Sequence, residues 1–123
     1  MIEVSAGWIE ENGRILLCRR PLGKANGGMW EFPGGKREEG ESGQETLERE
    51  LTEELGIRVK AGEEMARTVW NGPRGEIAIT LYPARLTEGE ITLLEHSEMK
   101  WLARSELAGM ELCPADRELL GMI

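Results

Sequence analysis

Apolar and polar residues alternate at the start of the chain. Ile2, Val4, Ala6 and Trp8 recur at every second position, which is the period at which side chains of a β-strand reach the same face. The pattern therefore predicts a strand over Ile2–Glu11 with one face directed toward a core.

A turn signal follows this strand. Asn12 and Gly13 tolerate the positive φ angles of a tight hairpin turn, and Arg14–Arg19 is again rich in apolar residues. We therefore expect a β-hairpin. The next segment, Arg20–Gly28, and the Pro-Gly-Gly run that ends at Gly35 contain too many turn formers for a helix.

The period of the apolar residues changes to that of a helix after Ser42. Ser42 and Glu45 match the capping-box pattern that begins a helix, and Gly56 stands where a left-handed C-cap is favoured. These signals predict a helix from Ser42 to Leu55. Its apolar stripe consists of Leu47, Leu51 and Leu55.

Shorter apolar segments follow this helix. We expect strand material over Arg58–Trp70 with a break at Gly62-Glu63-Glu64, a turn at Asn71–Gly75, a strand within Glu76–Leu86, a short strand over Met99–Leu102, a helical turn capped by Ser105 and a final helix over Arg117–Met122. Strands and helices in this order predict an α/β fold with a mixed sheet and helices on its faces. No linker or repeat divides the chain, so residues 1–123 are expected to form one domain.

Composition narrows the class of protein. Of the 123 residues, 40% are hydrophobic and 31% are charged, which is typical of soluble globular proteins. A formal net charge of −8 argues against a nucleic acid polymer as partner, because such a partner needs a basic face. No membrane helix or signal peptide is recognised. Cys18 and Cys113 lack metal-binding spacing, so we expect reduced, partly buried thiols in a cytoplasmic protein.

The predicted helix carries a second, acidic stripe beside its apolar one. Glu50, Glu53 and Glu54 follow the i, i+3, i+4 spacing, so their carboxylates lie on one face. Like charges at this spacing repel one another. A divalent cation would relieve the repulsion, and Mg²⁺ is commonly held by carboxylates together with substrate phosphates.

The segment from Gly35 to Ile57 resembles the Nudix box, G-x5-E-x7-R-E-U-x-E-E-x-G-U, in which U is aliphatic. Every defined position of that pattern is present in this chain: Gly35, Glu41, Arg49, Glu50, Leu51, Glu53, Glu54, Gly56 and Ile57. The segment Trp30–Lys36 is similar to the lead-in of the MutT-type branch, the nucleoside triphosphate pyrophosphohydrolases. The ending around Pro114-Ala115-Asp116 resembles that of bacterial CTP pyrophosphohydrolases of that branch.

The resemblance implies a fold, a reaction and a cofactor. The fold is an α/β/α sandwich around a mixed, curved sheet. The reaction is hydrolysis of a nucleoside triphosphate to the monophosphate and pyrophosphate, and it depends on Mg²⁺, or on Mn²⁺ in its place. Nucleotide-pool sanitation with 8-oxo-dGTP, CTP or a modified dCTP as substrate is expected, in a monomer or homodimer without membrane partners.

The resemblance also implies roles for residues. The metal ligands are Gly35 through its carbonyl, Glu50, Glu53, Glu54 and Glu95. Arg49 is expected to orient a glutamate of the box by an ion pair, which suits guanidinium geometry. Glu53, Glu50 and Glu95 remain alternatives for the general base.

Substrate contacts must come largely from outside the box. Arg20 and Lys36 flank the glycine-rich loop and are the candidate phosphate ligands. Trp30 and Phe32 either stack on a base or belong to the core. Asp116 either accepts a hydrogen bond from a base, such as the amino group of cytosine, or caps the last helix.

Three further interpretations stay open. Pro73 allows cleavage of a nucleotide sugar such as ADP-ribose, although the turn at Asn71–Gly75 also accounts for that proline. A non-catalytic binding module of the same fold is the other alternative. His96 is the only histidine, and we expect it to be a solvated loop residue outside the catalytic set.

Overall fold

A computed structural model describes the whole chain, Met1 to Ile123. Its elements in chain order are β1 (Ile2–Glu11), β2 (Arg14–Arg19), β3 (Trp30–Glu31), β4 (Gly34–Lys36), α1 (Gly43–Leu55), β5 (Arg58–Ala61), β6 (Ala66–Gly72), β7 (Gly75–Glu88), β8 (Glu98–Ala103), α2 (Arg104–Leu107) and α3 (Pro114–Gly121). None of the three helices is long and apolar enough to cross a membrane.

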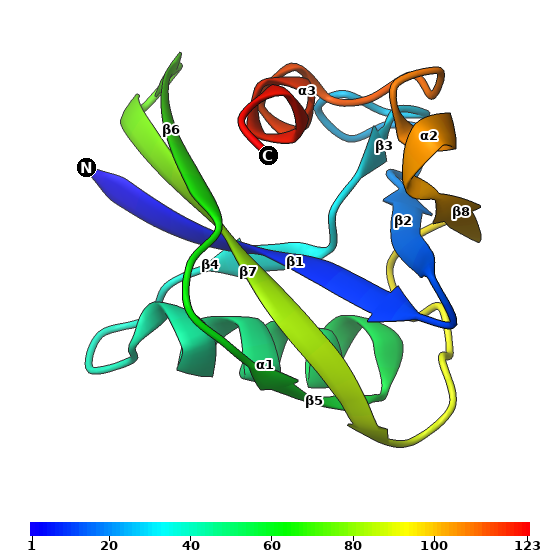
Figure 1. The fold of residues 1–123 in the computed structure, drawn as a ribbon. Helices are drawn as coiled ribbons and strands as arrows, with labels where there is room; N and C mark the ends of the chain where they lie inside the picture. The colour runs from blue at the N-terminus through cyan, green and yellow to red at the C-terminus, as the bar shows by residue number, and fades with distance from the viewer.

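The strands form one mixed sheet around β1. The order is β3-β2-β1-β7-β5, with β4 also paired to β1, β6 to β7 and β8 to β2. β1 runs parallel to β7 and antiparallel to β2 and β4. Figure 1 shows α1 on one side of the crossing strands β1 and β7, and α3 on the other. The predicted α/β class, with a mixed sheet between helices, is confirmed.

Each side of the sheet has its own hydrophobic core. On the α1 side, the leucine stripe of the helix is fully buried against Ile9, Leu16 and Tyr82. On the α3 side, the core includes Trp8 and Leu119. Because β1 separates the two cores, its middle segment from Ser5 to Ile9 is buried on both faces. Cys18 and Cys113 are free, as predicted, and both are buried rather than only partly buried.

Local signals located two elements well. Asn12 and Gly13 have φ angles of 53° and 76°, so the predicted hairpin turn is present between β1 and β2. The α1 helix has the complete capping box of Ser42 and Glu45, and Gly56 closes it with a φ of 68°. The position of this helix is therefore determined by residues inside the segment itself.

Other boundaries differ from the predictions. The Trp30–Lys36 segment, expected to be loop, contributes the short strands β3 and β4. Ser105 does not cap α2, because the helix begins one residue earlier and the Ala103 N–H donates to Glu106. α3 begins at Pro114 rather than Arg117, since the fixed φ of proline suits the first turn of a helix.

The hairpin of β6 and β7 accounts for Pro73. Gly72 pairs with Gly75, so Pro73 and Arg74 form the turn between these strands. Proline is favoured in such turns for conformational reasons. The nucleotide-sugar interpretation therefore loses the residue on which it rested.

Candidate active site

Glu54 is the most buried carboxyl group on α1. It is only 6% exposed, and its Oε1 atom has no hydrogen-bond partner. Burial raises the pKa of Glu54 to about 9, and the nearby carboxylates of Glu50, Glu31 and Glu95 act in the same direction. A buried acceptor without a donor or cation is costly in free energy, so this position is suited to a positive group.

Gly35 lies directly against Glu50. A Cβ atom on Gly35 would overlap the carboxyl group of Glu50, so a side chain at this position would displace the glutamate. β4 pairs Gly35 with Ser5 of β1, which holds this backbone beside the helix. Close approach of backbone and carboxylate is thus the physical reason for glycine here.

Arg49 forms ion pairs with Glu41, Glu50 and Glu53 of the same segment. Its Nε and Nη2 atoms donate to the two carboxylate oxygens of Glu41 at 2.6 and 3.1 Å. Its Nη1 lies 3.0 Å from Glu50 and 3.2 Å from Glu53, and Nη2 also donates to the carbonyl of Lys36. The bidentate contact with Arg49 lowers the pKa of Glu41 to about 2.

A small polar cavity adjoins the buried end of this acidic stripe. It has a volume of about 80 Å³ and is lined by Arg20, Pro21, Lys24, Glu31, Gly34, Glu54, Glu95 and His96. Six of these residues carry side chains that can be charged, and both signs are present. The cavity therefore offers cations for an anionic ligand and carboxylates for a metal ion in the same space.

Glu95 reaches this cavity because its loop is attached to the end of α1. The Thr92 N–H donates to the carbonyl of Leu55 at 2.8 Å, and the Leu94 N–H donates to the carbonyl of Glu54 at 3.0 Å. These bonds satisfy carbonyl groups that the end of a helix leaves free. The structure thus brings Glu95 together with Glu54, 41 positions earlier in the sequence.

His96 is buried, and the expectation that it is solvated was wrong. Only 5% of its side chain is exposed, and its Nε2 atom lies 2.8 Å from Oε2 of Glu31. The other oxygen of Glu31 lies 3.0 Å from Nη1 of Arg20. Glu31 and His96 were missed as site residues, although both belong to segments that carry the family resemblance.

Asp116 is buried on the α3 side of the sheet. It is 7% exposed, and its Oδ1 atom accepts a hydrogen bond of 3.0 Å from the N–H of Phe32. Burial raises the pKa of Asp116 to about 7, with a smaller contribution from Glu31, while the Phe32 N–H opposes the shift. The capping alternative has no support, because no side chain caps α3.

The backbone of Trp30 brings Asp116 to this place. The Trp30 N–H donates to the carbonyl of Glu111, and the Cys113 N–H donates to the carbonyl of Trp30, both at 2.8 Å. The rings of Trp30 and Phe32 lie in the core, with exposures of 5% and 3%. Their contact with a base stays a prediction, and the contacts described here are those of core residues.

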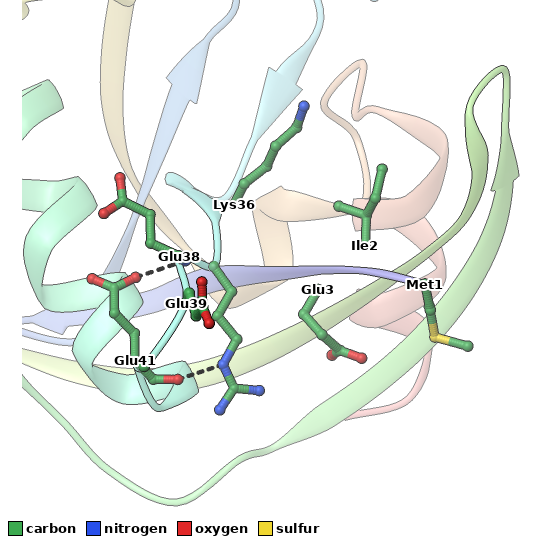
Figure 2. Close-up of a pocket in the computed structure, with 9 residues that line it drawn as sticks. Met1, Ile2, Glu3, Lys36, Glu38, Glu39 and Glu41 are labelled. Carbon is green, nitrogen blue, oxygen red and sulfur yellow. Dashed lines mark hydrogen bonds between the residues drawn. The ribbon is translucent and has the colours of Figure 1, made fainter.

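Lys36 lies apart from Arg20. Figure 2 shows Lys36 on a broad groove formed with Met1, Ile2, Glu3 and the acidic loop Glu38–Glu41, and this groove has a volume of about 760 Å³. Arg20 lines the smaller cavity instead. The two predicted phosphate ligands therefore line different hollows, one at the Gly34 end of β4 and the other at the Lys36 end.

The residues of the site suit a hard divalent cation. Glu54 supplies an unpartnered, buried oxygen, and Glu50 lies on the backbone of Gly35. No three acidic, histidine or cysteine side chains are already grouped around one point, since Arg49 holds Glu50 and Glu53. The side chains of Glu50 and Glu53 can rotate from Arg49 toward an ion. Their oxygens then suit Mg²⁺, which needs only a few protein ligands because it keeps several bound waters.

The chain is similar to known proteins over nearly its whole length. The sequence matches the NUDIX domain over residues 2–120. It is 39% identical to the CTP pyrophosphohydrolase of Escherichia coli K12 over 120 residues, 98% of this chain and 89% of that protein. It is 34% identical to the 8-oxo-dGTP diphosphatase of Haemophilus influenzae, over 98% of this chain and 89% of that one.

A solved structure shows the same fold. The MutT NUDIX hydrolase from Burkholderia pseudomallei superposes with a TM-score of 0.86 at 26% identity, covering 99% of this chain and 97% of that chain. The acidic helix, the adjacent glycine and the polar cavity thus occur in a chain that matches the family over nearly its full length. The chain belongs to the Nudix hydrolase family.

Proposed function

We propose that this enzyme, a single domain over residues 1–123, hydrolyses a nucleoside triphosphate to the monophosphate and pyrophosphate with Mg²⁺ as cofactor. The observation that carries the proposal is the buried, unpartnered oxygen of Glu54 on the wall of a cavity that Arg20 and Lys24 also line. A metal-bound polyphosphate supplies both the positive charge that Glu54 lacks and the negative charge that the two cations attract.

The proposed metal ligands are Glu50, Glu53, Glu54, Glu95 and the carbonyl of Gly35. When bound, Mg²⁺ neutralises charge on the phosphate oxygens and so favours attack by water. Mn²⁺ is the expected substitute, because carboxylate and carbonyl oxygens suit both ions.

The other residues of the site bind, orient and accept protons. Arg20 and Lys36 contact phosphate oxygens from the two ends of β4. Arg49 holds Glu53, whose side chain is 56% exposed and thus accessible to water. We favour Glu53 over Glu50 and Glu95 as the base that takes a proton from the attacking water. The water adds to one phosphorus of the α–β anhydride, and the bond from that phosphorus to the bridging oxygen breaks, which yields the monophosphate and pyrophosphate.

Asp116 is the proposed reader of the base. Its Oδ1 already accepts from Phe32, and the carboxylate has a second oxygen that can accept from an exocyclic amino group or a ring N–H. Cytosine and 8-oxoguanine both present such donors. The relatives named for CTP and for 8-oxo-dGTP support these two substrate classes, and nucleotide-pool sanitation in the cytoplasm is the role that follows.

The test is a panel of nucleoside triphosphates with Mg²⁺, ranked by kcat/KM and repeated with Asp116→Asn. We expect pyrophosphate release from at least one cytosine or oxidised guanine nucleotide, and a change in the ranking for the variant. Absence of release from every triphosphate contradicts the proposal. An unchanged ranking removes Asp116 as the base reader but leaves the reaction in place.

The binding-module alternative gives a different result in a metal titration. Mg²⁺ added to the protein without substrate is followed by the fluorescence of the four tryptophans and by the melting temperature. A metal-dependent enzyme changes at least one signal, whereas a module without a functional metal site changes neither.

A further inference from the structure

Glu31 shares its carboxylate between the partly exposed Arg20 and the buried His96. Its Oε1 lies 3.0 Å from Nη1 of Arg20, and its Oε2 lies 2.8 Å from Nε2 of His96. Each oxygen therefore has a single partner and a defined direction. A carboxylate oxygen only accepts hydrogen bonds, so the Nε2 atom of His96 is the donor.

Arg20 is held at two of its three nitrogens. Its Nε atom donates to the carbonyl of Ala25 at 2.7 Å, and its Nη1 donates to Glu31. Nη2 forms no hydrogen bond within the protein, and Arg20 lines the cavity, so Nη2 is the nitrogen available to a ligand. Because the guanidinium is planar, fixing two nitrogens also fixes the direction in which the third one donates.

The position of His96 is in turn set by backbone hydrogen bonds from its loop to α1 and to β2. The Leu94 N–H donates to the carbonyl of Glu54 on α1, and the Ser97 N–H donates to the carbonyl of Arg19 on β2, both at 3.0 Å. These two bonds hold the residues on either side of Glu95 and His96. The imidazole is thus buried in a segment with little freedom to move.

We infer that His96 is a positioning residue that acts through Glu31 to direct the guanidinium of Arg20 toward the phosphate oxygens of the substrate. The inference rests on the proposed function, since it concerns how that substrate is bound. His96 itself contacts neither the reacting atoms nor the metal. It fixes the Glu31 carboxylate, which would otherwise rotate and take Arg20 with it.

Two substitutions at this position separate the inference from a purely structural role. Glutamine in His96→Gln carries its amide nitrogen near the place of Nε2 and keeps the donor to Glu31, whereas asparagine in His96→Asn is too short. We expect His96→Asn to raise KM for the best triphosphate about tenfold or more, the size of a lost charge-assisted hydrogen bond. We expect His96→Gln to recover most of that loss, and kcat to change less than KM in both.

A double-mutant cycle with Arg20→Ala shows whether the effect passes through the arginine. In the Arg20→Ala background, His96→Asn should raise KM by less than about twofold, because the group it positions is already absent. Leu93→Ala, a change at an exposed residue of the same loop, is the control and should leave KM unaltered. If His96→Asn folds poorly, Glu31→Gln replaces it in the double-mutant cycle with Arg20→Ala.

The outcomes are distinct. Equal KM values for His96→Gln and His96→Asn, or additive effects with Arg20→Ala, overturn the inference while the wild-type activity still supports the proposed function. A wild-type protein that hydrolyses no triphosphate overturns the proposed function first. Recovery by glutamine together with a non-additive cycle supports the positioning role.

Discussion

Glu54 and Asp116 are two buried carboxyl groups on opposite sides of the sheet, and their surroundings differ. Glu54 has an oxygen without a partner, and its pKa is raised to about 9. Asp116 accepts from the Phe32 N–H, and its pKa is raised only to about 7. The Glu54 carboxyl thus lacks a positive partner, whereas the Asp116 carboxyl already has one hydrogen bond from the backbone. The α1 side is therefore suited to a metal and phosphates, and the α3 side to a neutral hydrogen-bonding ligand.

The two sides also differ in how the chain builds them. Nearly all acidic residues of the α1 side come from one continuous segment, Gly35–Ile57, with Glu95 added by a loop. The α3 side brings together Phe32 and Asp116, which lie 84 positions apart. A short segment thus carries the chemistry common to the family, while distant segments form the part that we propose selects the substrate.

The largest expected effect tests the α1 side directly. Replacing Glu53 and Glu54 together by glutamine should reduce pyrophosphate release by about 10³-fold or more, since it removes a candidate base and metal ligands. Glu48→Gln is the control on the same helix, because Glu48 accepts from the Ala61 N–H and glutamine keeps an acceptor. Substantial activity in the double variant would show that the chemistry resides elsewhere.

The pH dependence of stability tests the α3 side. Between pH 3.8 and about 7 the unfolded chain ionises Asp116 while the native protein keeps its proton. Unfolding then releases a proton, so this group lowers the free energy of unfolding as the pH rises, by at most ~1.4 kcal/mol per pH unit. Above both pKa values Asp116 is ionised in the native and the unfolded state, so it no longer changes the free energy of unfolding with pH.

Asp116→Asn should remove that slope. Urea unfolding of the wild type and the variant at several pH values from 4 to 8 measures it, and the difference between the two curves isolates Asp116 from other groups. If the free energies of unfolding of wild type and variant change with pH in the same way, Asp116 ionises at its ordinary pKa. Burial would then raise the pKa of Glu54 but not that of Asp116.

Metal binding should stabilise the protein through the α1 side and not through the α3 side. At a Mg²⁺ concentration 100-fold above Kd, we expect the free energy of unfolding to increase by about 2.7 kcal/mol. Glu54→Gln should lose most of this gain, whereas Asp116→Asn should retain it. Differential scanning calorimetry with and without Mg²⁺ makes the measurement, and an equal loss in both variants would contradict the assignment of the metal to α1.

The smallest effect concerns the helix start. Ser42→Ala removes the capping bond to the Glu45 N–H and should lower the free energy of unfolding by about 1 kcal/mol. The order of substrates in the panel should not change, because the cap lies outside the α3 side. A changed order would indicate that the two sides are coupled through α1.

Sequence patterns were sufficient where the determining contacts are local. The capping box, the leucine stripe and Gly56 act within a few residues of one another, so α1 was located with both of its ends. They were insufficient for His96, whose burial depends on Glu31, 65 positions away. They also place the start of α3 three residues too late, at Arg117 instead of Pro114, although proline suits the first turn of a helix.

The sequence by itself determined the acidic helix, its caps, the glycine before it and the family to which these residues belong, because helix periodicity and capping need only neighbouring residues. The tertiary structure alone decided which carboxyl group loses its solvent, which glutamate binds Arg20 and His96, and which backbone N–H meets Asp116. Burial and pairing of charged groups depend on strands that are distant in sequence and adjacent in the sheet.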